Sequence, residues 1–139
     1  MITLFTDVSH DHRAGVGAYA WWAETQEGES YRGAGIFPEL IDHTNVAEVY
    51  GMVNGVYAAI KEIQPPEASK IVMETDSGVA ISALAGHAYR HPHYEVLAQM
   101  LTTKLAEHGL EIEYKHAKAH PWCDRIARAL MRQHRSELV

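Results

Sequence analysis

The spacing of apolar residues changes along the chain and predicts an α/β fold. Short or alternating apolar runs over residues 2–9, 15–23 and 30–37 predict three strands. The connection over residues 26–29 is short and polar, as in a hairpin. Three strands joined in this way predict an antiparallel meander.

The period then becomes helical. From Thr44 to Ile63 apolar residues recur at helical spacing, and the run stops before Pro65. We expect a long helix here, capped by Asp42 or Thr44. The rest of the chain predicts, in order, a strand over 70–75, a brief helix from its cap Ser77 to Ala85, a helix over 94–107, a strand over 110–114 and a helix over 122–134.

These elements predict a mixed five-stranded sheet covered by helices. Their order is βββαβαβα, with two helical segments between the fourth and fifth strands. The antiparallel start is followed by parallel crossovers. A chain of 139 residues with 47% apolar content fits one domain, residues 1–139, with its own core.

Composition narrows the class of protein. No apolar stretch approaches the roughly 18 residues that a membrane span needs, and Met1 leads directly into a strand rather than a signal sequence. Cys123 is the only cysteine, which excludes a disulfide framework. We therefore expect a soluble, cytoplasmic protein with no membrane association and no disulfide-linked partner.

The charge distribution is uneven. The net charge of −6 opposes nucleic-acid binding, yet residues 115–139 carry six Lys or Arg and only two Asp or Glu. A basic C-terminal edge is therefore available. The same arginines equally fit a solvated helix face: Arg125, Arg128, Arg132 and Arg135.

Four carboxylates suggest a function. Asp7 lies in the first strand, Glu48 in the long apolar helix, Asp76 directly after a buried strand and Asp124 at the start of the last helix. For three of them the sequence predicts burial, which is costly for a carboxylate without a positive partner. Hard divalent cations prefer such oxygen ligands. The pattern therefore indicates a shared metal site for phosphodiester chemistry, although each acid alone also fits a turn, a helix surface or a cap.

Four segments together resemble the active-site blocks of type I ribonuclease H. They are residues 5–9 (FTDVS), 44–48 (TNVAE), 74–77 (ETDS) and 120–130 (HPWCDRIARAL), in the family's order and approximate spacing. The resemblance spans essentially the whole chain. It implies a ribonuclease H-like fold and an endonuclease that cleaves the RNA strand of an RNA/DNA hybrid.

The resemblance also implies roles for the acids. Two Mg²⁺ or Mn²⁺ ions about 4 Å apart would stabilise the attacking and the leaving oxygen. Asp7 would bridge both ions, Glu48 and Asp76 would complete one site, and Asp124 would complete the other.

The resemblance implies further roles for residues other than the acids, beginning with the loop before the last helix. The family places a mobile histidine there, and His116 aligns with it better than His120. An amide at Asn45 would reach the minor groove. Ser9 and Ser77 would donate to backbone phosphates or only cap local turns, and Lys118 would contribute positive charge.

The chain departs from the family pattern in two places. Residues 86–93 replace the basic helix and loop with which many members grip the hybrid, so binding should be weak and salt-sensitive. His10 to Gly15 replace a glycine-rich run. Several residues also have open alternatives: histidines 87, 91 and 93 as a transition-metal site or solvated loop residues, His10 and His12 likewise, and Trp21, Trp22 and Trp122 as stacking platforms or core residues.

Two other functions remain open from the sequence. A nuclease of the same fold could act on DNA, as resolvases and exonucleases do, although the run Asp7-Val8-Ser9 lacks the paired acids of proofreading exonucleases. A non-catalytic nucleic-acid-binding module fits the missing basic helix and the net acidity.

Overall fold

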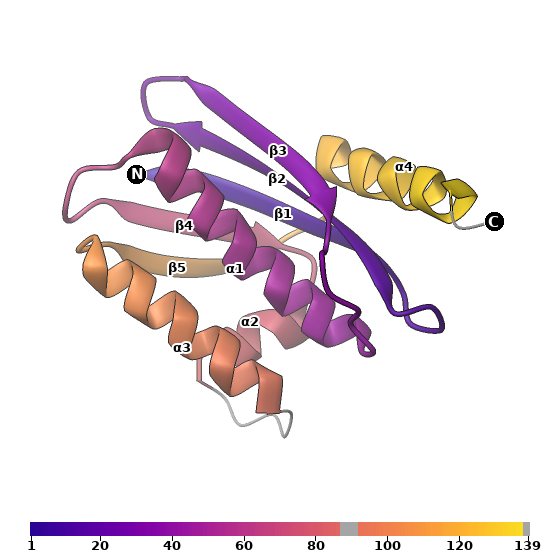
Figure 1. Cartoon of the computed structure of the whole chain (residues 1–139). Helices are drawn as coiled ribbons and strands as arrows, with labels where there is room; N and C mark the ends of the chain where they lie inside the picture. Colours follow the sequence, from indigo (N-terminus) through magenta and orange to yellow (C-terminus); the bar gives the residue numbers. More distant parts are fainter. Residues whose placement is uncertain (87–91, 138–139) are drawn as a thin grey trace.

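The computed structural model describes residues 1–86 and 92–137 and contains one five-stranded sheet (Figure 1). The strands are β1 (Ile2–Asp11), β2 (Val16–Thr25), β3 (Ser30–Ile36), β4 (Lys70–Thr75) and β5 (Glu111–His116). Their spatial order is β3-β2-β1-β4-β5. The first three pair antiparallel, whereas β4 pairs parallel with both β1 and β5. The mixed sheet predicted from the sequence is confirmed.

Helices cover both faces of the sheet. They are α1 (Thr44–Ile63), α2 (Gly78–Leu84), α3 (Pro92–Glu107) and α4 (Pro121–Glu137). Figure 1 shows α1 across one face with α2 and α3 beside it, and α4 on the opposite face. The strand and helix assignments agree with the sequence expectations apart from end positions, where α3 begins two residues earlier and α4 ends three residues later.

Two apolar layers result. The larger one lies between the sheet and α1 to α3, and Leu4, Val56 and Met73 are completely buried in it. The smaller one lies between the sheet and α4, where Ala20 of β2 packs with Cys123 and Ala127 of α4. The sheet is therefore held from both sides, and its middle strand β1 is fixed.

Glycines bring α1 close to β1. A Cβ atom at Gly51 would lie 2.5 Å from Val8 Cγ2, and one at Gly55 would lie 2.6 Å from Thr6 Cγ2. Real Cβ atoms do not approach this closely, so glycine permits this helix position. Because Glu48 lies one turn before Gly51, the same approach sets the height of Glu48 above β1.

One predicted cap is wrong and another is confirmed. The N-cap of α1 is His43, without a side-chain cap bond, rather than Asp42 or Thr44. Thr44 is already in the helix, and its hydroxyl oxygen lies 2.9 Å from Nδ1 of His10. Ser77 caps α2 as expected, because its hydroxyl accepts a hydrogen bond from the Ala80 N–H.

Within the described residues, no helix is both long and apolar enough to cross a bilayer.

Candidate metal centre

Three acids from distant parts of the chain meet at one point. One carboxylate oxygen from each of Asp7, Glu48 and Asp76 lies within 4.8 Å of the other two. Two of them are brought together by strand register: Phe5 of β1 is opposite Glu74 of β4 in a parallel pair, and Asp7 and Asp76 each follow two residues later. The close approach of α1 to β1 brings in Glu48.

The cluster is buried on one side and open on the other. Asp7 is only 6% exposed, and Glu48 is half-buried. Asp76 is exposed, contrary to the burial expected from its position after β4. The reason is that β4 ends at the buried Thr75, so the chain leaves the sheet at the next residue. The open side gives solvent and ligands access to the carboxylates.

Burial and neighbouring charges raise the pKa of two of the acids, Asp7 and Glu48. The pKa of Asp7 is raised to about 7 by burial, then by the charge of Asp76 and by a hydrogen bond with Asp124, against a lowering by the Val8 N–H. The pKa of Glu48 is raised to about 8 by burial and by the charges of Asp7 and Asp76. A cation that approaches such a carboxylate stabilises its ionised form.

The donor set fits a hard divalent cation. Among the described residues, no Lys or Arg forms an ion pair with Asp7, Glu48 or Asp76. The three offer only oxygen atoms, which is the ligand chemistry of Mg²⁺ and Mn²⁺.

The fourth predicted acid lies beside this group but is paired. Asp124, in the first turn of α4, lies close enough to Asp7 to help raise the pKa of the Asp7 carboxyl. It also forms an ion pair with Arg128 one turn later, with 3.0 Å between Nε and Oδ1. The structure therefore brings Asp124 next to the three-acid cluster without making it a member.

The two candidate histidines have different surroundings. His116, at the end of β5, donates from Nε2 to the backbone oxygen of Asp76 at 2.9 Å. His120 instead packs between Phe5 and Trp22, with ring centroids 4.8 Å and 5.2 Å away. Burial lowers the pKa of His120, and its Nδ1 has no hydrogen-bond partner among the described residues. The structure thus places His116 at the edge of the acids and uses His120 in packing.

The predicted substrate-contacting residues have different surroundings. Ser9 follows Asp7 by two residues on β1 and therefore shares its face of the sheet. Asn45 is half-buried in the first turn of α1. Ser77 is occupied as a cap. Lys118 is exposed between β5 and α4.

The remaining sequence candidates behave mainly as structural residues. Trp21 is buried in the core as expected. Trp22 and Trp122 meet edge to face, and the Arg32 guanidinium lies 5.6 Å and 5.5 Å from their rings. Of the other histidine candidates, 87 and 91 lie outside the described residues, and His12 is exposed in the turn after β1.

His10 has a structural role in the site that the sequence did not predict. Besides its contact with the Thr44 hydroxyl, its Nε2 donates to the Ile41 carbonyl oxygen. It therefore ties the start of α1 to the end of β1, the two elements that carry Glu48 and Asp7. The available signal was its position three residues after Asp7, where the family pattern has a glycine-rich run.

Comparisons with known proteins identify the fold. No family model and no curated protein matches the chain. The N-terminal ribonuclease H domain of Rv2228c from Mycobacterium tuberculosis matches with TM-score 0.77, 17% identity and coverage of 99% of this chain and 98% of that one. Ribonuclease H1 of Halobacterium salinarum matches with TM-score 0.74, 15% identity and coverage of 95% and 98%.

A third similar structure is LC11-RNase H1 in complex with an RNA/DNA hybrid, with TM-score 0.78, 12% identity and coverage of 96% of this chain and 99% of that one. At these identities the likeness establishes the fold. The chain has a ribonuclease H-like fold in which Asp7 of the central strand, Glu48 of α1 and Asp76 after β4 form an acidic cluster.

Proposed function

We propose that this protein is a metal-dependent endoribonuclease that hydrolyses the RNA strand of RNA/DNA hybrids by a two-metal mechanism. The observation that carries the proposal is the convergence of Asp7, Glu48 and Asp76 within 4.8 Å on a ribonuclease H-like fold. The similar LC11-RNase H1, solved with an RNA/DNA hybrid, supports this substrate class.

The acids would hold the metal ions. Asp7 would contact both, Glu48 and Asp76 would complete the first site, and Asp124 would complete the second after release from Arg128. Mg²⁺ or Mn²⁺ bound there would supply positive charge at the attacking and leaving oxygens of the phosphodiester. Burial of Asp7 keeps this charge effective by excluding water on the sheet side.

Other residues would orient the nucleic acid and move protons. His116 already donates from Nε2 to the Asp76 carbonyl, so its second nitrogen would exchange a proton near the reacting phosphate. Asn45 would contact the 2′-hydroxyls that distinguish RNA from DNA, and Ser9 would donate to a backbone phosphate. Lys118 would contact a phosphate.

We also propose the domain extent and the cellular location of this activity. Residues 1–139 would act as one domain in the cytoplasm. Cys123 is fully buried, which supports the absence of a disulfide-linked partner.

The test compares labelled RNA/DNA hybrid, DNA duplex, RNA duplex and single strands with Mg²⁺ or Mn²⁺. We expect cleavage of RNA in the hybrid alone, lost in Glu48→Gln. Glu62→Gln is the matched control, because Glu62 is an exposed acid on the same helix. Cleavage of DNA duplex would replace the proposal with a DNA nuclease. Hybrid binding without cleavage would leave a non-catalytic module.

A further inference from the structure

The exposed large apolar side chains gather in one place. Apart from Met1, the described residues with such side chains exposed are Leu40 (76% exposed), Val96 (58%) and Met100 (41%). All three line one hollow of about 340 Å³ between the segment before α1 and the helix α3. Scattered apolar residues are normal on a surface, whereas a gathered set marks an interaction site.

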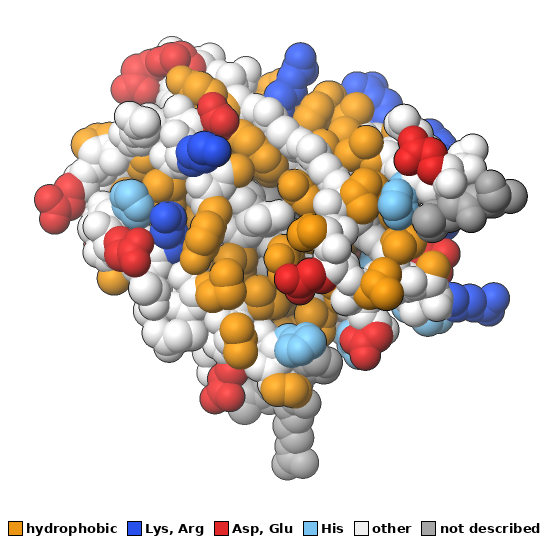
Figure 2. Space-filling model, viewed as in Figure 1, with side chains coloured by type: hydrophobic (Ala, Val, Ile, Leu, Met, Phe, Trp, Pro, Cys, Tyr) orange, Lys and Arg blue, Asp and Glu red, His pale blue; other side chains and the backbone are white. Residues whose placement is uncertain are grey.

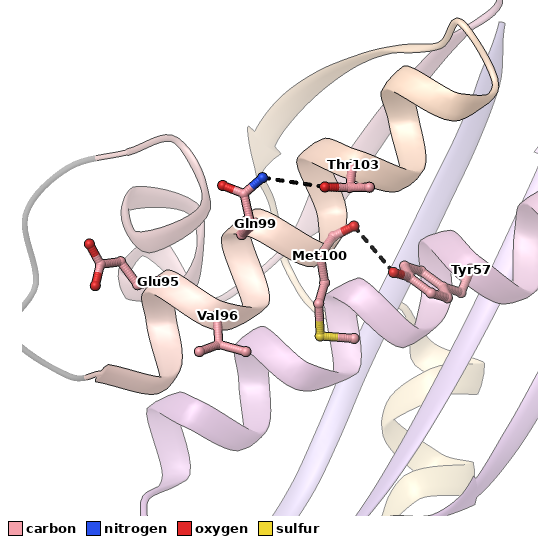
Figure 3. A pocket seen from close by; sticks show the side chains of 6 residues that line it. All are labelled: Tyr57, Glu95, Val96, Gln99, Met100 and Thr103. Carbon is pink, nitrogen blue, oxygen red and sulfur yellow. Dashed lines mark hydrogen bonds between the residues drawn. The ribbon is translucent and has the colours of Figure 1, made fainter.

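The hollow continues along α3. A second, more open hollow of about 600 Å³ shares Val96 and Met100 with the first and extends to Tyr57 and Thr103 (Figure 3). Together they form one groove between α1 and α3, which we call the α3 groove. Its lining residues, from the two hollows together, are Glu39, Leu40, Ile41, Asp42, Val46, Tyr50, Tyr57, His93, Glu95, Val96, Leu97, Gln99, Met100 and Thr103.

The groove is preformed at its walls and adaptable at its centre. The Tyr57 hydroxyl donates to the Met100 backbone oxygen at 3.2 Å, which joins α1 to α3 (Figure 3). Gln99 donates to Thr103 on the outer wall at 3.3 Å. The unbranched Met100 side chain between these contacts can adjust to the shape of a ligand. Little ordering is therefore needed before a partner binds.

One end of the groove is acidic. Glu39, Asp42 and Glu95 line it, and no Lys or Arg is among the described lining residues. Figure 2 shows acidic side chains around the apolar surface on this face. The pKa of Tyr50, which also lines the groove, is raised by burial and then by the charge of Glu39. An acidic rim repels nucleic acid and favours a basic ligand.

We propose that the α3 groove docks a basic amphipathic segment of a partner protein. Apolar side chains of the segment enter beside Val96 and Met100, as in helix-in-groove recognition. Its Lys or Arg side chains face Glu39 and Glu95.

The groove and the carboxylate cluster can be occupied together. Glu48 contributes to the cluster, whereas Val46 and Tyr50, two residues to either side on α1, line the groove. Residues two apart on a helix point to different sides. Docking therefore leaves the open side of the metal centre accessible.

The experiment selects binders from a displayed library of helical peptides on the full chain. We expect selected peptides to combine apolar residues at helical spacing with flanking Lys or Arg. Their affinity should fall roughly tenfold or more in Val96→Ser/Met100→Ser and in Glu95→Lys. Glu107→Lys makes the same charge change on exposed α3 surface outside the groove and should bind normally.

Several results would overturn the proposal: no selected binder, acidic binders, or binding that ignores the Val96 and Met100 substitutions. Concentration-dependent self-association that Met100→Ser abolishes would also overturn it by assigning the groove to a second copy of the chain. Hybrid cleavage should be unchanged in all these variants. A failure of docking is thus distinguishable from a failure of the proposed nuclease function.

Discussion

The two halves of the candidate metal centre are prepared differently. Asp7, Glu48 and Asp76 lie on or directly after segments that the core fixes, and one oxygen from each lies within 4.8 Å of the others. Asp124 lies on the surface helix α4 and is paired with Arg128. The first half stores unfavourable electrostatic energy that a bound metal ion would relieve, whereas the second would first have to exchange a protein cation for a metal ion.

This difference explains how a protein with an excess of acidic residues can contain such a site. The three-acid half lowers the stability of the metal-free protein because the carboxyls of Asp7 and Glu48 resist ionisation. The Asp124 half costs little, because an exposed ion pair satisfies it. We therefore expect the first ion to bind to the free protein and the second to bind with the substrate phosphate.

The largest expected effect is that of Asp7→Asn. Loss of the shared ligand should lower hybrid cleavage by roughly 10³-fold or more. The same change removes a buried carboxylate, so the metal-free protein should become more stable at pH 8 by about 1–3 kcal/mol. Cleavage kinetics and urea unfolding measure the two effects. Asp42→Asn, at an exposed position, should change neither, and a destabilised Asp7→Asn protein would contradict the stored-energy interpretation.

The pH dependence of metal-free stability isolates the three-acid half. The pKa values of Asp7 and Glu48 rise from 3.8 and 4.5 to about 7 and about 8 in the folded protein. On raising the pH above 4 the unfolded chain therefore loses these protons first. The stability from these groups should fall between about pH 4 and pH 8 and then level off.

Denaturant unfolding across this pH range without metal is the measurement. Glu48→Gln should flatten part of the decline, and Mg²⁺ added at pH 8 should restore stability, because it binds the folded form. A wild-type profile that stays flat from pH 4 to pH 8 would show that the cluster is not strained.

A substitution at Gly51 should move the helix that carries Glu48. In Gly51→Ala the new Cβ would lie 2.5 Å from Val8 Cγ2, so α1 must shift away from β1. We expect a loss of about 1–3 kcal/mol in stability, which exceeds the gain in helix propensity. Cleavage should fall roughly tenfold, because Glu48 moves with the helix.

The matched control for this helix shift is the double variant Val8→Ala/Gly51→Ala. It removes the contacting methyl groups and should recover both stability and cleavage relative to Gly51→Ala. Equal losses in the single and double variants would place the cause elsewhere.

The sequence predicted the three-acid half better than the Asp124 half for a physical reason. Asp7 and Asp76 stand at the ends of apolar runs, and strand period and burial are local properties of such runs. The Asp124–Arg128 pair follows ordinary helical spacing, which suits a solvated face equally well. No local pattern states which partner an acid prefers when an arginine and a metal site compete for it.

Long-range contacts were beyond prediction for a similar reason. His10 and Thr44 are 34 residues apart, and only the folded geometry shows that Thr44 contacts His10 rather than capping α1. The α3 groove depends on side chains of α1, α3 and the segment before α1 remaining uncovered together. Each of these segments alone reads as ordinary amphipathic surface.

The smallest predicted effect tests the Asp124 half directly. Arg128→Ala frees Asp124 from its ion pair, and because both side chains are partly exposed, stability should change by less than about 1 kcal/mol. The Mg²⁺ concentration for half-maximal cleavage should fall roughly twofold, since a metal ion no longer competes with the guanidinium. Arg132→Ala, on the same helix and outside the ion pairs of the described residues, controls for the loss of one positive charge. A higher Mg²⁺ requirement in Arg128→Ala alone would mean that Arg128 holds Asp124 in its metal-binding position, and the two halves would then be equally prepared.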